Sequence, residues 1–214
     1  HGRTANATPS TTRYPGASPA GASTMTSFEF VFGMISVITS LALTRLLSGG
    51  VALYRHADRI RFSWRHGGWT AMALMLLLGN WAAFWQMRGI SDWSGSEALV
   101  PLLFVSVLYA FCDLVMPEEP RDGSVLDRSA YHEHQGRRYK MLQLAFSVLA
   151  ILVIARRSPS LLDGLSNSGF ALVAATCSIV ALRTRRVWLD TAAAVVLVAM
   201  SPLFLWMHLR GLSG

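Results

Sequence analysis

Charged residues are scarce in this chain of 214 residues: only 14% are Asp, Glu, Lys or Arg, against about 25% in a typical soluble domain. Hydrophobic residues make up 52% of the chain, and they come in long uninterrupted runs. A disordered protein would need the opposite composition, with low hydrophobicity and high charge. This composition excludes a disordered protein, argues against an ordinary soluble domain, and predicts a polytopic membrane protein.

Cysteine and lysine are also nearly absent. Cys112 and Cys177 lie inside apolar runs, so we expect buried thiols and no disulfide framework, redox motif or zinc site. The single lysine, Lys140, lies at the start of an apolar run, which excludes a retinal Schiff base in a helix interior. The chain also has no phosphate-binding loop, dinucleotide fingerprint or zinc-protease motif. We therefore expect no cofactor and no bound metal, and the sequence favours a protein that is not an enzyme.

Residues 1–27 differ in composition from the rest of the chain. The segment is rich in Ala, Thr, Ser, Pro and Gly without periodicity, so we expect a disordered tail, with Met25 as a candidate natural start. Residues 28–214 are expected to form one membrane domain with six apolar runs. These runs lie at about 28–47, 69–87, 98–116, 139–155, 165–182 and 187–209.

The six runs predict an all-α, polytopic integral membrane helical bundle of six transmembrane helices. A bilayer core of ~30 Å needs about 20 helical residues, and backbone groups in lipid are satisfied internally by helices. The fifth run is the shortest. It spans only if Leu165 to Ser168 join the helix.

Arg and Lys are distributed unevenly over the predicted connections. With six spans, twelve basic residues fall on one side of the membrane and six on the other. The positive-inside rule places the richer side in the cytoplasm and both termini on the non-cytoplasmic side. We expect a bacterial cytoplasmic (inner) membrane as the location, anionic lipid headgroups at the cytoplasmic face as partners, and no nucleic acid.

Polar side chains within the spans are the candidate functional residues, because such groups are costly in lipid. Four of them are predicted to share one depth near the cytoplasmic side: Arg45, Asp113, Gln143 and Asp190. Arg45 paired with Asp113 or Asp190 would lock helices together. The alternative is a site for a substrate, proton or ligand.

Two further patterns within the runs consist of polar residues and of small residues. Ser106 and Tyr109 form a polar stripe with Asp113 on one helix face, and Asn80 is the deepest polar residue. Small residues at helical spacing predict close helix packing, within this chain or against another. They are Gly33, Ser36 and Ser40 in the first run, and Ala171 and Ala175 in the fifth.

The connection between the third and fourth runs holds His132-Glu133-His134. This triplet lacks a third ligand at a defined spacing, so we expect a solvated polar surface and no metal site. We predict that residues 127–138 form a short polar helix lying at the cytoplasmic surface.

Three functions remain open at this point. The first is a non-enzymatic structural, accessory or sensory subunit, as a homo-oligomer or with other membrane subunits. The second is a small transporter or channel that uses Arg45, Asp113 and Asp190, with Pro202 breaking the last helix. The third is an enzyme acting on lipid, because Arg suits phosphate recognition. Arg45 meeting Asp113 directly in a dry interface favours the first function, and Arg45 facing a cavity favours the second.

Overall fold

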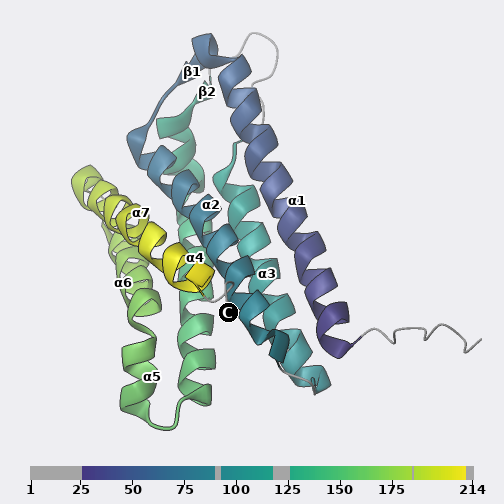
Figure 1. Ribbon diagram of the computed structural model, residues 1–214. Helices are drawn as coiled ribbons and strands as arrows, with labels where there is room; N and C mark the ends of the chain where they lie inside the picture. Colours follow the sequence, from purple (N-terminus) through teal and green to yellow (C-terminus); the bar gives the residue numbers. More distant parts are fainter. Residues whose placement is uncertain (1–25, 90–92, 118–125, 185, 211–214) are drawn as a thin grey trace, which may run out of the picture.

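The computed structural model describes residues 26–89, 93–117, 126–184 and 186–210, which fold almost entirely into helices (Figure 1). In chain order the elements are α1 (Ser27–Arg55), the 3-10 turn η1 (Ala57–Arg59), β1 (Ile60–Arg61), α2 (Trp64–Trp85), the 3-10 turn η2 (Gln86–Gly89), α3 (Gly95–Val115), β2 (Leu126–Asp127), α4 (Arg128–Arg157), α5 (Leu161–Asn167), α6 (Gly169–Arg183) and α7 (Val187–Arg210). The expected disordered tail lies outside the described residues, apart from Thr26 and Ser27.

Five helices are long and apolar enough to cross a membrane: α1, α2, α3, α4 and α7. A sixth span is formed if α5 and α6 together count as one, but the chain bends by 70° between them. The prediction of an all-α protein is confirmed. The expected fifth span is divided, since residues 161–167 form a separate helix that does not continue the axis of α6.

The position of the break differs from the expected one. Pro202 lies inside α7, which continues unbroken from Val187 to Arg210. The structure therefore places no interruption at Pro202 and a sharp bend between Asn167 and Gly169. A 70° bend in a short apolar segment is the geometry of a broken span or of a re-entrant loop.

One end of the bundle carries Arg55, Arg59 and Arg183, and we call it the basic end. Two helices are longer there than predicted. Helix α1 extends about two turns beyond Leu47 to Arg55, and α4 begins about three turns before Tyr139. The Asp127 side chain caps α4 by accepting hydrogen bonds from the amides of Ser129 (2.8 Å) and Ala130 (3.2 Å). The prediction of a separate surface helix at 127–138 was therefore wrong, because this polar segment continues directly into the fourth apolar run.

Helix α2 lies at the centre of the bundle and contacts α1, α3, α4 and α7 (Figure 1). Its buried side includes Trp69, Leu76 and Leu77. Small residues allow α7 to approach closely, since a Cβ added to Gly68 would lie 3.1 Å from the Cβ of Ala194. Helix α1, in contrast, packs mainly on α2 and α3, on one side of the bundle.

A short parallel pairing ties two connections together at the basic end. Strand β1, between α1 and α2, pairs with β2, which leads into α4, with Ile60 opposite Leu126. This pairing fixes the start of α4 against the start of α2. It therefore sets the position of the polar side chains of both helices.

Candidate functional site

Asp190 lies at the centre of a buried group of polar side chains from three helices. Its Oδ2 is 2.5 Å from His132 Nε2 and 3.9 Å from Arg65 Nε, and its Oδ1 is 2.8 Å from Lys140 Nζ. Tyr139 is hydrogen-bonded through its hydroxyl to His132 Nδ1. We call these five residues the Asp190 cluster. Their side chains are all buried or nearly so, with Arg65 the most exposed at 11%.

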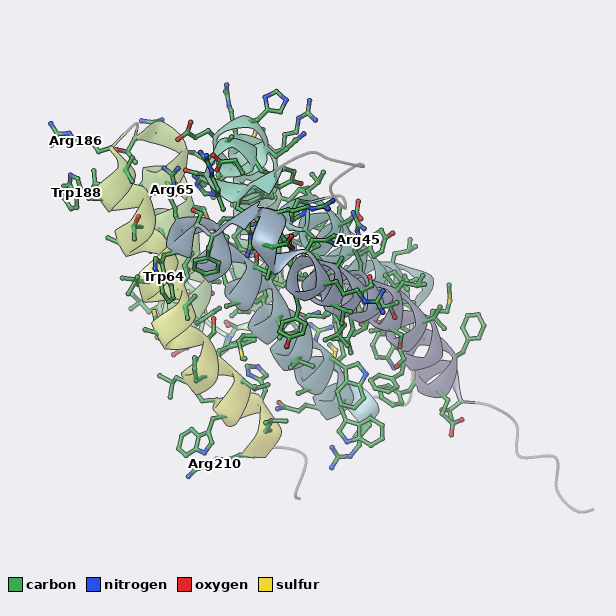
Figure 2. All side chains as sticks on the ribbon, turned by 90° about the horizontal axis from the view of Figure 1, so that it is seen from above. Arg45, Trp64, Arg65, Arg186, Trp188 and Arg210 are labelled. Carbon is green, nitrogen blue, oxygen red and sulfur yellow. The ribbon has the colours of Figure 1, made fainter. Side chains whose placement is uncertain are left out.

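Three of these residues lie on one face of α4, and the other two lie in the first turns of α7 and α2. His132, Tyr139 and Lys140 share one face of α4, because residues seven and eight positions apart are separated by about two helical turns. Asp190 lies in the first turn of α7, where the helix dipole favours a carboxylate. Figure 2 places Arg65, the second residue of α2, beside the start of α7.

Within the Asp190 cluster, His132 links the Tyr139 hydroxyl to the Asp190 carboxylate, and the same carboxylate lies against two cations. A neutral His132 imidazole donates from Nε2 to Asp190 and accepts at Nδ1 from the Tyr139 hydroxyl. Arg65 also donates to the exposed Glu133, with 3.2 Å between Nη2 and Oε1. The two cations, Arg65 and Lys140, are thus matched by the two carboxylates of Asp190 and Glu133. Such a network joins α2, α4 and α7, and it is neutral once the exposed Glu133 is counted with the five residues.

The second ion pair lies elsewhere and joins α1 to α3. Arg45 Nε is 2.8 Å from Asp113 Oδ1, and the two side chains are 35% and 44% exposed. In Figure 2, Arg45 lies on the α1 side of the bundle and Arg65 on the side where α7 begins. Arg45 therefore pairs with Asp113 and not with Asp190.

Gln143 and Asp190 are both buried, as predicted for the polar layer, but the four expected residues do not form one group. Gln143 lies one turn beyond Lys140 on α4 and is fully buried. Its Nε2 donates to Ser147 Oγ at 3.3 Å, while its Oε1 has no partner among the described residues. The predicted layer is thus divided between the Arg45–Asp113 pair and the Asp190 side of the bundle.

The predicted polar stripe faces outward. Ser106 and Tyr109 are exposed on α3, and the Ser106 hydroxyl donates to the carbonyl oxygen of Leu102 within the same helix. Asn80 is buried in α2, and no hydrogen bond from its amide to another helix occurs in the described part of the chain. These three residues therefore do not line a common path through the bundle.

The small residues of the two predicted packing faces have different surroundings. Ala171 and Ala175 are buried on α6, where that helix packs against α4 and α7. On α1, Ser36 accepts a hydrogen bond from Trp81 Nε1 at 3.4 Å, but Gly33 and Ser40 are exposed. A Cβ added to Gly33 would meet no atom within 4 Å. The surface around Gly33 is therefore not covered by any of the residues that the structure describes.

An open groove of about 890 Å³ lies beside α2, between α1 and α7, at the basic end of the bundle. We call it the α1–α7 groove. Its lining is almost entirely apolar, and the only charged residue in that lining is Arg128, the first residue of α4. Arg128 is 6% exposed, and its Nη2 donates to Thr70 Oγ1 at 3.2 Å.

Arg128, His132 and Lys140 are buried, which the sequence alone did not predict. His132 is 3% exposed, so the expected solvated surface is wrong for this residue, although Glu133 and His134 are exposed. His66 is a further buried residue that was missed, and neither of its ring nitrogens has a partner among the described residues. Helical spacing could have identified these residues. Once α4 is taken to begin at Arg128, its buried positions recur with helical periodicity from Arg128 to Gln143.

The described residues contain no group of three or more His, Cys, Asp or Glu side chains that could hold a metal ion. The candidate functional features are the Arg45–Asp113 ion pair, the Asp190 cluster, and the α1–α7 groove with the buried Arg128. Comparison of the chain with protein families, with curated proteins and with solved structures finds no match.

Proposed function

We propose that this protein is a non-enzymatic accessory or sensory subunit of an assembly in a bacterial cytoplasmic membrane. The observation that carries the proposal is that Arg45, Asp113 and Asp190, the charged residues singled out within the helices, each contact a side chain of opposite charge. Arg45 meets Asp113 directly, and Asp190 meets Lys140 and His132. None of these five side chains lines the α1–α7 groove. A transporter would instead direct such groups toward a path open to water.

The outward surface of α1 supports a role in association. Large apolar side chains such as Phe30, Val37 and Leu41 are more than half exposed there, next to the uncovered Gly33 and Ser40. Small residues on a helix surface allow a second helix to approach closely in lipid. The proposed contact surface is therefore the side of α1 that faces away from α2 and α3.

Association can be tested by native mass spectrometry of the protein released in native-lipid particles. We expect a fixed oligomer or a defined partner for the natural sequence. Gly33→Leu should lower the assembled fraction severalfold, because the added side chain would hold the two helices apart. The control is Gly95→Leu, which changes another glycine with open space around it. A lone chain in native lipid, or equal loss in both variants, would contradict the proposal.

The proposal includes six spans, with α5 and α6 crossing together, and both termini on the non-cytoplasmic side. The arrangement of the helices supports this topology, because the ends of α1, α3 and α6 lie at the same end of the bundle as the starts of α2, α4 and α7 (Figure 1). Basic residues such as Arg55, Arg59 and Arg183 lie at these ends. The positive-inside rule assigns this end to the cytoplasm.

Labelling of single cysteines tests this orientation, in a chain whose native Cys112 and Cys177 are changed to Ala. Leu161→Cys, at the exposed start of α5, is expected to react with a membrane-impermeant maleimide on intact cells. Asp58→Cys, at the basic end, should react only after the cells are permeabilised. The reverse pattern would refute the orientation, and labelling of both sites from outside would refute the span count.

A further inference from the structure

We infer that the α1–α7 groove binds one anionic phospholipid of the bilayer, with its phosphate at Arg128 and an acyl chain along α1 and α7. This inference concerns a binding site and does not depend on the proposed association or on the orientation of the chain. It rests on the shape of the groove, on the charge of Arg128, and on the position of the groove in the bundle.

The walls of the groove suit an acyl chain. Aliphatic side chains of α1 and α7, small residues of α2 and three aromatic residues line it. The volume of about 890 Å³ falls within the range of roughly 300–1,000 Å³ typical of small-molecule sites. The apolar lining includes Leu46, Leu47 and Leu53 of α1, Gly67, Gly68 and Ala71 of α2, and Ala194, Val195 and Val198 of α7.

Arg128 differs from the other buried cations in having no acidic partner in the part of the chain that the structure describes. Arg65 and Lys140 each lie within 4 Å of a carboxylate. Arg128 forms no ion pair within the described residues, and its Nε has no hydrogen-bond partner there. A buried guanidinium without a counter-charge is costly, so an anion at this point is strongly favoured.

The chemistry of Arg128 selects a phosphate. A guanidinium presents its donors as a planar fork that matches phosphate oxygens. Thr70 orients this fork by accepting from Nη2 at 3.2 Å, and its own hydroxyl donates to the carbonyl oxygen of His66 at 3.0 Å. The Thr70 hydroxyl is therefore already occupied, whereas the buried Arg128 Nε has no hydrogen-bond partner among the described residues.

The groove runs from the basic end of the bundle into its apolar part. Arg128 begins α4 near the ends of the neighbouring helices. The groove continues along α7 from Thr191 to Ala199, a distance of about 12 Å. Trp64 is 84% exposed and lies along the groove, consistent with an aromatic residue at the headgroup level. The groove is therefore basic at Arg128 and apolar along α7, which matches a lipid with its phosphate at Arg128 and its hydrocarbon chain along α7.

Native mass spectrometry with defined lipids tests the inference. The full chain is equilibrated with equal amounts of phosphatidylglycerol and phosphatidylcholine that carry identical acyl chains. We expect one phosphatidylglycerol to be retained in preference to phosphatidylcholine by about tenfold or more. Arg128→Gln should reduce this preference by about tenfold, the effect of losing one charge-assisted contact. Arg137→Gln removes the same charge from an exposed position of α4 and should leave the preference unchanged.

A second pair of variants keeps the test independent of Arg128 and of its role in folding. Ala71→Trp fills the groove from the exposed side of α2 and should abolish retention of the lipid, while Ala145→Trp, on the exposed side of α4, should not. Excess inorganic phosphate should fail to displace the lipid, because it lacks the acyl chain. Equal retention of the two lipids by the natural chain, displacement by phosphate, or no effect of Ala71→Trp would each overturn the inference.

Discussion

Asp190→Asn is expected to lower the free energy of unfolding by about 3–5 kcal/mol. The amide keeps the shape of the carboxyl group but removes its charge. Lys140 would then lose its only ion pair within the described residues, and Arg65 would retain only the exposed Glu133. Cations that are buried and unpaired are among the most destabilising groups in a folded protein.

Unfolding in mixed micelles, followed by helical circular dichroism, measures this loss. The matched control is Asp58→Asn, the same substitution on a side chain that is 76% exposed at the same end of the bundle. This control should change stability by less than about 0.5 kcal/mol. A loss below about 1 kcal/mol for Asp190→Asn would mean that the Asp190 cluster does not hold α7 to α2 and α4.

A double substitution separates the lost charge balance from a general disturbance of packing. Asp190→Asn leaves Lys140 and Arg65 without the Asp190 carboxylate. Lys140→Met removes one of these two cations, and Met retains most of the length of the side chain. The double variant should therefore be more stable than Asp190→Asn alone, by about 1–3 kcal/mol. If the two losses simply add, then Lys140 and Asp190 are not coupled and the ion pair contributes nothing specific.

The helical character of the chain could be predicted because it depends on the composition of each run alone. A run such as 98–116 must be helical in lipid, whatever its neighbours are. The same reasoning fails at the ends of helices that continue into polar sequence. Residues 128–138 were expected to lie on the surface because of their charge. They extend α4, and three of them, Arg128, His132 and Gly136, are buried.

The partners of the polar residues could be predicted only in part. Depth along a helix can be counted from the sequence, so Arg45, Asp113 and Asp190 were recognised as costly charges in the spans. Which acid meets Arg45 depends on which helices are neighbours, and the sequence leaves that choice open. The structure packs α1 against α3 and brings Arg45 Nε to 2.8 Å from Asp113 Oδ1, so Asp113 is the partner.

Small residues show the same limit, since spacing predicts a narrow helix face but not what covers it. Among the described residues, Ala171 and Ala175 are covered by neighbouring helices, whereas Gly33 is exposed. The close approach of α2 to α7 uses Gly68 and Gly79, which no regular stripe of small residues marks. Their role depends on how α7 crosses α2, which is a property of the packed bundle.

Gly79→Leu is expected to destabilise the protein by about 1–3 kcal/mol, the usual cost of adding atoms to a packed contact. A Cβ at position 79 would lie 2.5 Å from Phe204 Cε1 and 2.6 Å from Cδ1. Phe204 has little freedom to move, because its ring is stacked on Phe170 at 4.6 Å and lies 4.3 Å from the ring of His208. The added side chain must therefore push α7 away from α2.

Gly33→Leu provides the matched control, because a Cβ added at this position of α1 meets no atom of the described residues within 4 Å. In lipid there is no hydrophobic force to hold two apolar helices together, so close contact between them contributes directly to stability. Gly79→Leu should therefore lower the unfolding midpoint of the isolated chain, while Gly33→Leu leaves it unchanged and affects only association. Equal midpoints for the two variants would show that α7 moves aside at little cost and that the α2–α7 contact does not stabilise the bundle.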